Sequence, residues 1–168
     1  MLLLGGLDTV SSATMHNTHF LATRHDHLQQ LLGWPELIPN AVEELLRRFS
    51  APNVGRVARQ DFDFHGAHIK AGEMILFSTS IAGLDESRFP DAMTVDFKRP
   101  HLKRDSLAFG TGIHMCSRIH LARRELCTTL EEVLPRLKNL RLAKDAEIEY
   151  ASGGTVTISS ALPLTWET

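Results

Sequence analysis

The stretch that decides the fold is Phe109-Gly110-Thr111-Gly112-Ile113-His114-Met115-Cys116, which is followed by Leu121-Ala122-Arg123-Arg124-Glu125. It places a cysteine at the end of a glycine-bearing loop, where a helix-forming run begins. The positive end of a helix and its free backbone N–H groups favour a thiolate over a thiol. The two glycines let the backbone turn tightly and approach a flat, bulky group. A thiolate held in this way is the electron-donating axial ligand that haem iron needs.

The same residues carry a resemblance to a known family. The spacing of Phe109, Gly112 and Cys116 resembles the haem-ligand loop of the cytochrome P-450 superfamily, F-x-x-G-x-x-x-C-x-G, with Arg118 at the last glycine. The resemblance covers essentially the whole chain and looks closest to the carboxy-terminal part of the bacterial camphor 5-monooxygenases. Other shared segments are Gly5-Gly6-Leu7-Asp8-Thr9-Val10, Glu43-Glu44-Leu45-Leu46-Arg47-Arg48-Phe49-Ser50 and Ala161-Leu162-Pro163-Leu164.

This resemblance implies a mainly α fold with small β-sheets (α+β), the C-terminal portion of the cytochrome P-450 fold. Residues 1–168 would be a single partial domain. The apolar run Met1-Leu2-Leu3-Leu4 begins without a capping residue, as if part-way along a helix. Because family members have more chain upstream, we expect a fragment that binds haem weakly and hydroxylates nothing by itself.

The composition narrows the choice of partners and compartment. At 168 residues and 43% apolar content, the chain can bury one sizeable core. A net charge of −2 and a pI near 6.5 argue against nucleic acid or an anionic membrane as a partner. Cys116 and Cys127 lie on or beside one helix, so a disulfide is not expected and a reducing compartment is. With no signal peptide or membrane span in evidence, the sequence predicts a cytoplasmic protein.

Hydrophobic periodicity and breaker residues predict helices first and short strands later. Helices are expected at about 2–24 (with a polar interruption at Ser11-Ser12), 27–32, 39–49 and 117–134. Short strands are expected between 54 and 69, with a turn at Gly66. The run 74–81 should pass from strand into short helix, and 85–108 should be irregular and wrapped against the core. Strands are expected near 140–142, 148–150 and 156–158, with Gly153-Gly154 as a hairpin turn.

Cys116 is the candidate iron ligand, and the alternative is a buried structural cysteine. Phe109 would pack beneath the porphyrin near the sulfur, and Gly112 belongs to the ligand loop. The resemblance further implies that His114 and Arg56 hold the two haem propionates, Arg56 by a charge-assisted pair. Cys127 lacks such neighbours and is expected in the core.

A zinc site is a competing interpretation of the same segment. His114, Cys116 and His120 have plausible zinc-ligand spacing, because His120 lies one helical turn beyond the cysteine. Structural zinc needs four ligands, and catalytic zinc needs three convergent ones with supporting partners. The sequence offers no fourth ligand nearby.

The opening helix carries the expected distal site. Gly5 and Gly6 inside a helix each cost about 1 kcal/mol relative to alanine, so they call for a reason such as space for a ligand. Thr9 can donate to the Gly5 carbonyl and loosen the helix locally. In the resembled family, the pair matching Asp8 and Thr9 delivers protons during oxygen activation. The alternative is that Asp8 caps a helix that starts there.

Glu44 and Arg47 are three residues apart on one helix and therefore face each other. By itself this spacing also fits a surface ion pair worth about 0–1 kcal/mol. The resemblance implies a buried structural network joined by Arg99, which would cost about 3–5 kcal/mol to break.

Three residues depart from the family pattern. Arg118 replaces a glycine, and a long cation there must swing outward or crowd the haem. Val54 stands where the camphor enzymes have an aspartate near a propionate, and Pro52 replaces a substrate-facing valine. The expected substrate pocket is formed by Leu4, Gly5, Pro52, Thr155 and Val156.

The implied function is that of a haem-thiolate monooxygenase with haem b, which inserts one oxygen atom from O2 into a C–H bond. Its substrate would be a small apolar molecule, for which a terpenoid is one candidate, and its electrons would come from a ferredoxin-type donor. A positive surface for that donor could comprise Arg118, His120, Arg123 and Arg124, which otherwise form a solvated helix face. The alternatives are a haem-binding module without turnover and a zinc-binding domain.

Overall fold

The computed structural model describes residues 4–148, 150–152, 157–159 and 161–167. Its helices are α1 (Leu4–Thr23), α2 (His25–Gly33), α3 (Ile38–Arg48), α4 (Thr79–Gly83), α5 (Leu102–Asp105) and α6 (Ile119–Val133), with short 3-10 turns η1 (Pro35–Leu37) and η2 (Gly112–His114). Its strands are β1 (Asn53–Val57), β2 (Phe62–Phe64), β3 (Ala67–Ile69), β4 (Met74–Ser78), β5 (Lys138–Leu142), β6 (Tyr150–Ser152), β7 (Thr157–Ser159) and β8 (Leu164–Glu167). This order matches the mainly α, partly β fold expected from the sequence.

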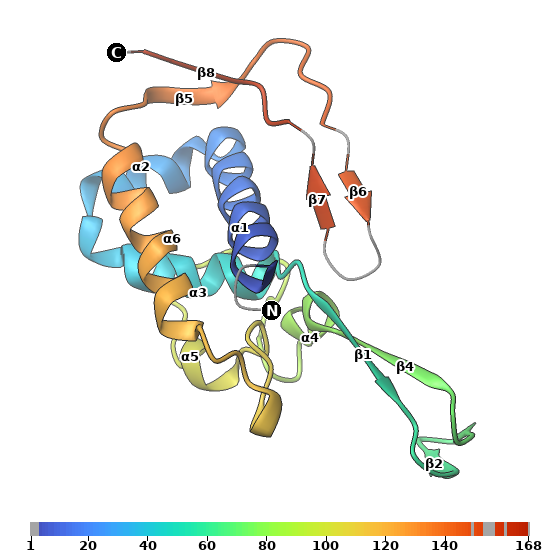
Figure 1. Ribbon diagram of the computed structural model, residues 1–168. Helices are drawn as coiled ribbons and strands as arrows, with labels where there is room; N and C mark the ends of the chain where they lie inside the picture. The colour runs from blue at the N-terminus through green and yellow to red at the C-terminus, as the bar shows by residue number, and fades with distance from the viewer. Residues whose placement is uncertain (1–3, 149, 153–156, 160, 168) are drawn as a thin grey trace.

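The core lies where α1, α2, α3, α6 and β5 meet (Figure 1). Apolar residues recur at helical spacing on α3, and α6 contributes Leu126 and Leu130 to the same cluster. The helix predicted at about 2–24 is confirmed as α1, which runs unbroken through the polar pair Ser11-Ser12. Ser12 is buried, and its hydroxyl lies 3.3 Å from Nδ1 of His16 one turn later, so this polar residue has a partner inside the helical body.

Each described sheet has two antiparallel strands. β1 pairs with β4, and with the β2–β3 hairpin at its end this ribbon projects from the helical body as an arm (Figure 1). The β2–β3 turn uses Gly66 with φ of 85°, a conformation that suits glycine. β6 pairs with β7, and β5 pairs with the more distant β8. The predicted turn Gly153-Gly154 lies outside the described residues.

The segment between α4 and α6 is largely irregular and packs against the helices, as expected. Its residues Phe97 and Leu102 are each 1% exposed, so the segment belongs to the core rather than to a free loop. Asn40 on α3 donates to the carbonyls of Phe97 and Arg99, at 2.7 and 3.1 Å. Among the described residues no helix is long and apolar enough to cross a membrane.

Candidate functional site

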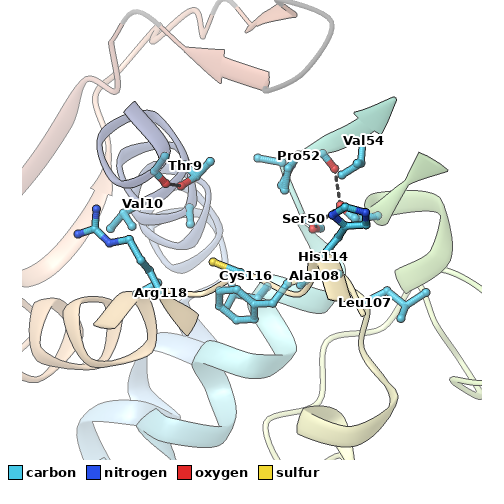
Figure 2. A pocket seen from close by; sticks show the side chains of 18 of the residues that line it. Thr9, Val10, Ser50, Pro52, Val54, Leu107, Ala108, His114, Cys116 and Arg118 are labelled. Carbon is cyan, nitrogen blue, oxygen red and sulfur yellow. Dashed lines mark hydrogen bonds between the residues drawn. The ribbon is translucent and has the colours of Figure 1, made fainter. Parts of the chain in front are cut away.

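A cavity of about 580 Å³ lies between α1 and the loop that carries Cys116 (Figure 2). Its lining is mainly apolar and comes from α1, β1, α4, α6 and the loop 107–116. Gly5, Gly6 and Thr9 line it from α1, while Cys116 lines it from the opposite loop. An apolar cavity with a few convergent polar groups is the usual form of a small-molecule site.

The Cys116 loop is held by its own backbone. The Cys116 N–H donates to the Phe109 carbonyl at 2.9 Å, which closes the loop just before α6. Gly110 and Gly112 have φ of 71° and 64°, so both adopt the left-handed conformation that glycine tolerates best. Phe109 lines the cavity with Cys116, whereas Gly112 shapes the turn without lining it. The half-buried Cys116 therefore faces the cavity from a fixed turn next to the start of α6.

On α1 the hydroxyl of Thr9 donates to the Gly5 carbonyl at 2.8 Å. This is the bond expected from the sequence. Asp8 lies inside α1, so the alternative that it caps a helix starting there is wrong. Its side chain is exposed and does not line the cavity. Thr9 is thus the member of the pair that faces the cavity.

The two expected propionate partners line the same cavity. Arg56 is on β1, where its Nη1 donates to the Gly55 carbonyl at 2.8 Å, and His114 is in η2. Both side chains are exposed at the cavity rim. Pro52 and Val54 also line the cavity from the start of β1.

Arg118 lines the cavity with its guanidinium against α1, so the expectation that it belongs to a positive outer surface is wrong. It lies on the opposite side of Cys116 from His114 in Figure 2. Its guanidinium lies against Gly6 of α1, where an added Cβ would be 2.8 Å from Nη1. A side chain at Gly6 would meet this cation, which is one reason for a glycine there.

Arg123 is also unavailable as a free surface cation. Its Nη2 donates to the buried carboxylate of Glu43 on α3 at 3.0 Å, and its guanidinium carbon lies 5.2 Å from the ring centroid of Phe109. These contacts tie α6, α3 and the Cys116 loop together. Of the four cations expected at the outer surface, only His120 and Arg124 are exposed.

The structure brings Glu44, Arg47 and Arg99 together beside the site. Glu44 accepts two hydrogen bonds from Arg47, both 2.8 Å, and one from Nε of Arg99 at 3.1 Å. The Glu44 and Arg47 side chains are both 0% exposed. Arg47 also donates to the carbonyls of Ala92 and Thr94 at 2.9 and 3.2 Å, and to that of Gly83. This network joins α3 to the irregular segment and to α4, so its role is structural.

Several cavity residues were not predicted from the sequence. Ser50 and Thr79 share a hydrogen bond of 2.7 Å between their hydroxyls, and Thr79 also donates to the Pro52 carbonyl. This pair holds the base of the β1–β4 arm at the cavity wall. Helical spacing could have revealed others, because Val10 and Ala13 continue the face of Gly6 on α1 while Ala122 and Glu125 follow Arg118 on α6.

Some predicted residues are not placed by the structure. The side chain of Leu4 lies outside the described residues, as do Thr155 and Val156. The zinc interpretation is not supported, because no three potential metal-ligating side chains converge within the described ranges. Cys127 packs against the core, and burial, followed by the nearby Glu131 and Glu43 carboxylates, raises its thiol pKa.

The residues of the cavity suit a thiolate-bound haem, with one exception. Cys116 can supply the sulfur ligand, the apolar walls can cover a porphyrin, and Arg56 and His114 can meet two carboxylates at the rim. The exception is Arg118, a long cation that lines the cavity with its guanidinium against Gly6 of α1 and takes up room that a smaller side chain would leave for a porphyrin.

Comparison with known proteins agrees with this geometry. The family described as Cytochrome P450 matches residues 35–161. The chain is 36% identical to nocardicin C N-oxygenase of Nocardia uniformis subsp. tsuyamanensis over 98% of its length, and 38% identical to pentalenic acid synthase of Streptomyces avermitilis over 99%. It spans 42% and 41% of these relatives.

A solved structure of cytochrome P450 CYP101C1 superposes with a TM-score of 0.93 at 33% identity, and the match covers 99% of this chain and 42% of that one. Members of the family bind haem b through a cysteine thiolate. The fold, the matched residues and the relatives together show that this chain belongs to the cytochrome P450 family.

Proposed function

We propose that this chain, a single partial domain of 168 residues, forms the haem-thiolate site of a monooxygenase. The observation that carries the proposal is the placement of Cys116 in an apolar cavity, opposite the Thr9–Gly5 hydrogen bond of α1. Cys116 binds the iron of haem b, Phe109 covers the sulfur side, and Gly112 allows the turn between them. Arg56 and His114 pair with the propionates. When bound, the haem supplies the redox chemistry that inserts one atom of dioxygen into a C–H bond.

In this proposal Thr9 and Asp8 transfer protons from solvent to the cavity. Because the Thr9 hydroxyl donates its hydrogen to Gly5, its oxygen keeps lone pairs that can accept a hydrogen bond from a group in the cavity. Asp8 precedes it and is exposed, so its carboxylate can exchange protons with solvent. Asp8 thus faces solvent and Thr9 faces the cavity at neighbouring positions of α1.

The substrate is a small apolar molecule, for which a terpenoid is one candidate. Gly5 and Pro52 line the described cavity, and Leu4, Thr155 and Val156 are proposed to extend the substrate pocket. Electrons come from a ferredoxin-type donor, for which α6 offers the exposed basic side chains of His120 and Arg124. A cytoplasmic location agrees with the expected reduced cysteines.

The iron ligand is tested by two matched substitutions. Cys116→Ser should abolish the red-shifted carbon monoxide spectrum of a thiolate-bound ferrous haem, because serine offers no thiolate. Cys127→Ser should leave this spectrum unchanged, because Cys127 packs in the core. Both variants are loaded with haem, reduced and exposed to carbon monoxide in parallel. A thiolate spectrum that persists in the Cys116 variant would overturn the assignment.

A further inference from the structure

Arg118 connects the two walls of the candidate haem cavity. It is the residue just before α6, two positions after Cys116, and its side chain reaches α1 on the other wall. A Cβ at Gly6 would lie 2.8 Å from Nη1, 3.1 Å from Cζ and 3.3 Å from Nη2 of Arg118. All three atoms belong to the guanidinium group, so its whole planar end packs where Gly6 leaves α1 bare.

The Arg118 side chain crosses the space between the two cavity walls, where a porphyrin would lie. A planar group bound by the Cys116 sulfur must lie between the Cys116 loop and α1. Arg118 lines the same cavity as Cys116 and Thr9 and spans from one of these walls to the other. The side chain and a porphyrin therefore compete for part of one space.

The competition can be resolved by the side chain alone. The Arg118 side chain has a long, flexible aliphatic stem. The part of Arg118 that would meet a porphyrin is the distal end of this side chain, not the backbone. Rotation of the side chain toward solvent would free the cavity without moving α1 or α6.

We propose that Arg118 is a latch on the cofactor site: its guanidinium packs on Gly6 at the cavity wall, and it must swing out for haem to bind to Cys116. This inference rests on the proposed haem site. The apparent affinity for haem should therefore depend on Arg118, because the apparent affinity of a ligand falls in proportion to the fraction of chains in the binding-competent state. Replacing Arg118 should remove that penalty.

The first test is a haem titration of the whole chain with three variants. Arg118→Gly and Arg118→Ala should bind haem about tenfold more tightly than the parent chain, if roughly one parent chain in ten is open. Arg136→Ala removes an exposed cation that does not line the cavity, and it should leave the affinity unchanged. Equal or weaker affinity in both Arg118 variants, with a thiolate spectrum in the parent chain, would overturn the latch but keep the haem site. If none of the chains shows a thiolate spectrum, both proposals fall.

The second test needs no haem and examines the Arg118–Gly6 contact itself. Gly6→Ala should raise the melting temperature in an Arg118→Ala background, because alanine favours the helix over glycine. In the parent chain the gain should be smaller, because the new methyl group meets the guanidinium. The difference between the two gains measures the coupling of the two residues. Equal gains would show that Arg118 does not rest on Gly6 and would overturn the latch.

Discussion

At the scale of single residues, two glycines of this chain differ sharply in their surroundings. A Cβ on Gly83 of α4 would lie 2.1 Å from the carbonyl oxygen of Arg47, which is backbone and cannot move aside cheaply. The Gly83 carbonyl in turn accepts a hydrogen bond from the buried Arg47 guanidinium. Gly33, the last residue of α2, has no atom within 4 Å of its Cβ position.

We therefore expect Gly83→Ala to lower the free energy of unfolding by about 3 kcal/mol, the upper part of the range for overpacking. Gly33→Ala is the matched control and should be neutral or slightly stabilising, because alanine has the better helix propensity. Urea denaturation of the two variants beside the parent chain measures both values. A Gly83 variant as stable as the parent would mean that α4 does not press against α3.

At the scale of elements, the Glu44 network fixes α3 against the irregular segment. Besides its two arginine partners, Glu44 accepts a hydrogen bond from the backbone N–H of Asp96 at 3.0 Å. Arg99 in turn donates to the carbonyls of Pro90, Asp91 and Thr94. Removing the one carboxylate would leave the buried Arg47 guanidinium and the partly buried Arg99 guanidinium without their anion.

Glu44→Ala should accordingly destabilise the chain by about 3–5 kcal/mol, as for other buried pairs that lose one partner. Glu132→Ala breaks an ion pair with Arg136 whose two side chains are 62% and 66% exposed, and it should cost about 0–1 kcal/mol. Chemical denaturation compares the two. A Glu44 variant no less stable than the Glu132 variant would contradict the structural role given to the network.

The helices could be predicted from the sequence because their signals are local. The spacing of apolar residues in α3 and the glycines of the Cys116 loop each determine the backbone structure within a few residues of their own positions. The pairing of β5 with β8 was not predicted, because it joins residues 138–142 to 164–167 across a long stretch of chain. The sequence showed that Arg118 was unusual, yet not that it would turn toward Gly6, because side-chain direction depends on what the fold brings opposite. The Arg123–Glu43 pair was missed for the same reason, since α6 and α3 meet only in the folded chain.

At the scale of the whole molecule, the helical body and the β1–β4 arm differ in how they are supported. The body buries residues from four helices and β5 in its main core, with Leu21, Leu28, Leu45 and Leu140 all 0% exposed. The arm is a two-stranded ribbon that extends away from this core (Figure 1). Its Val57, Met74 and Leu76 are 62%, 75% and 60% exposed. Two strands without a packed face have little stability of their own.

The base of the arm is the exception, because Ser50 and Thr79 tie it to the cavity wall. Amide hydrogen exchange should therefore show a gradient along the arm. Amides of α3 and α6 should exchange only when the whole chain unfolds, those near Asn53 and Ser78 should be intermediate, and those near Val57 and Met74 should exchange fastest. Thr79→Val should speed exchange near Asn53 and Ser78 and leave the far end as it was, because it removes the hydroxyl that bonds to Ser50 and to the Pro52 carbonyl. Uniform protection from Asn53 to Val57 would show that the arm opens together with the core, and that the cavity wall it forms is as rigid as the helices.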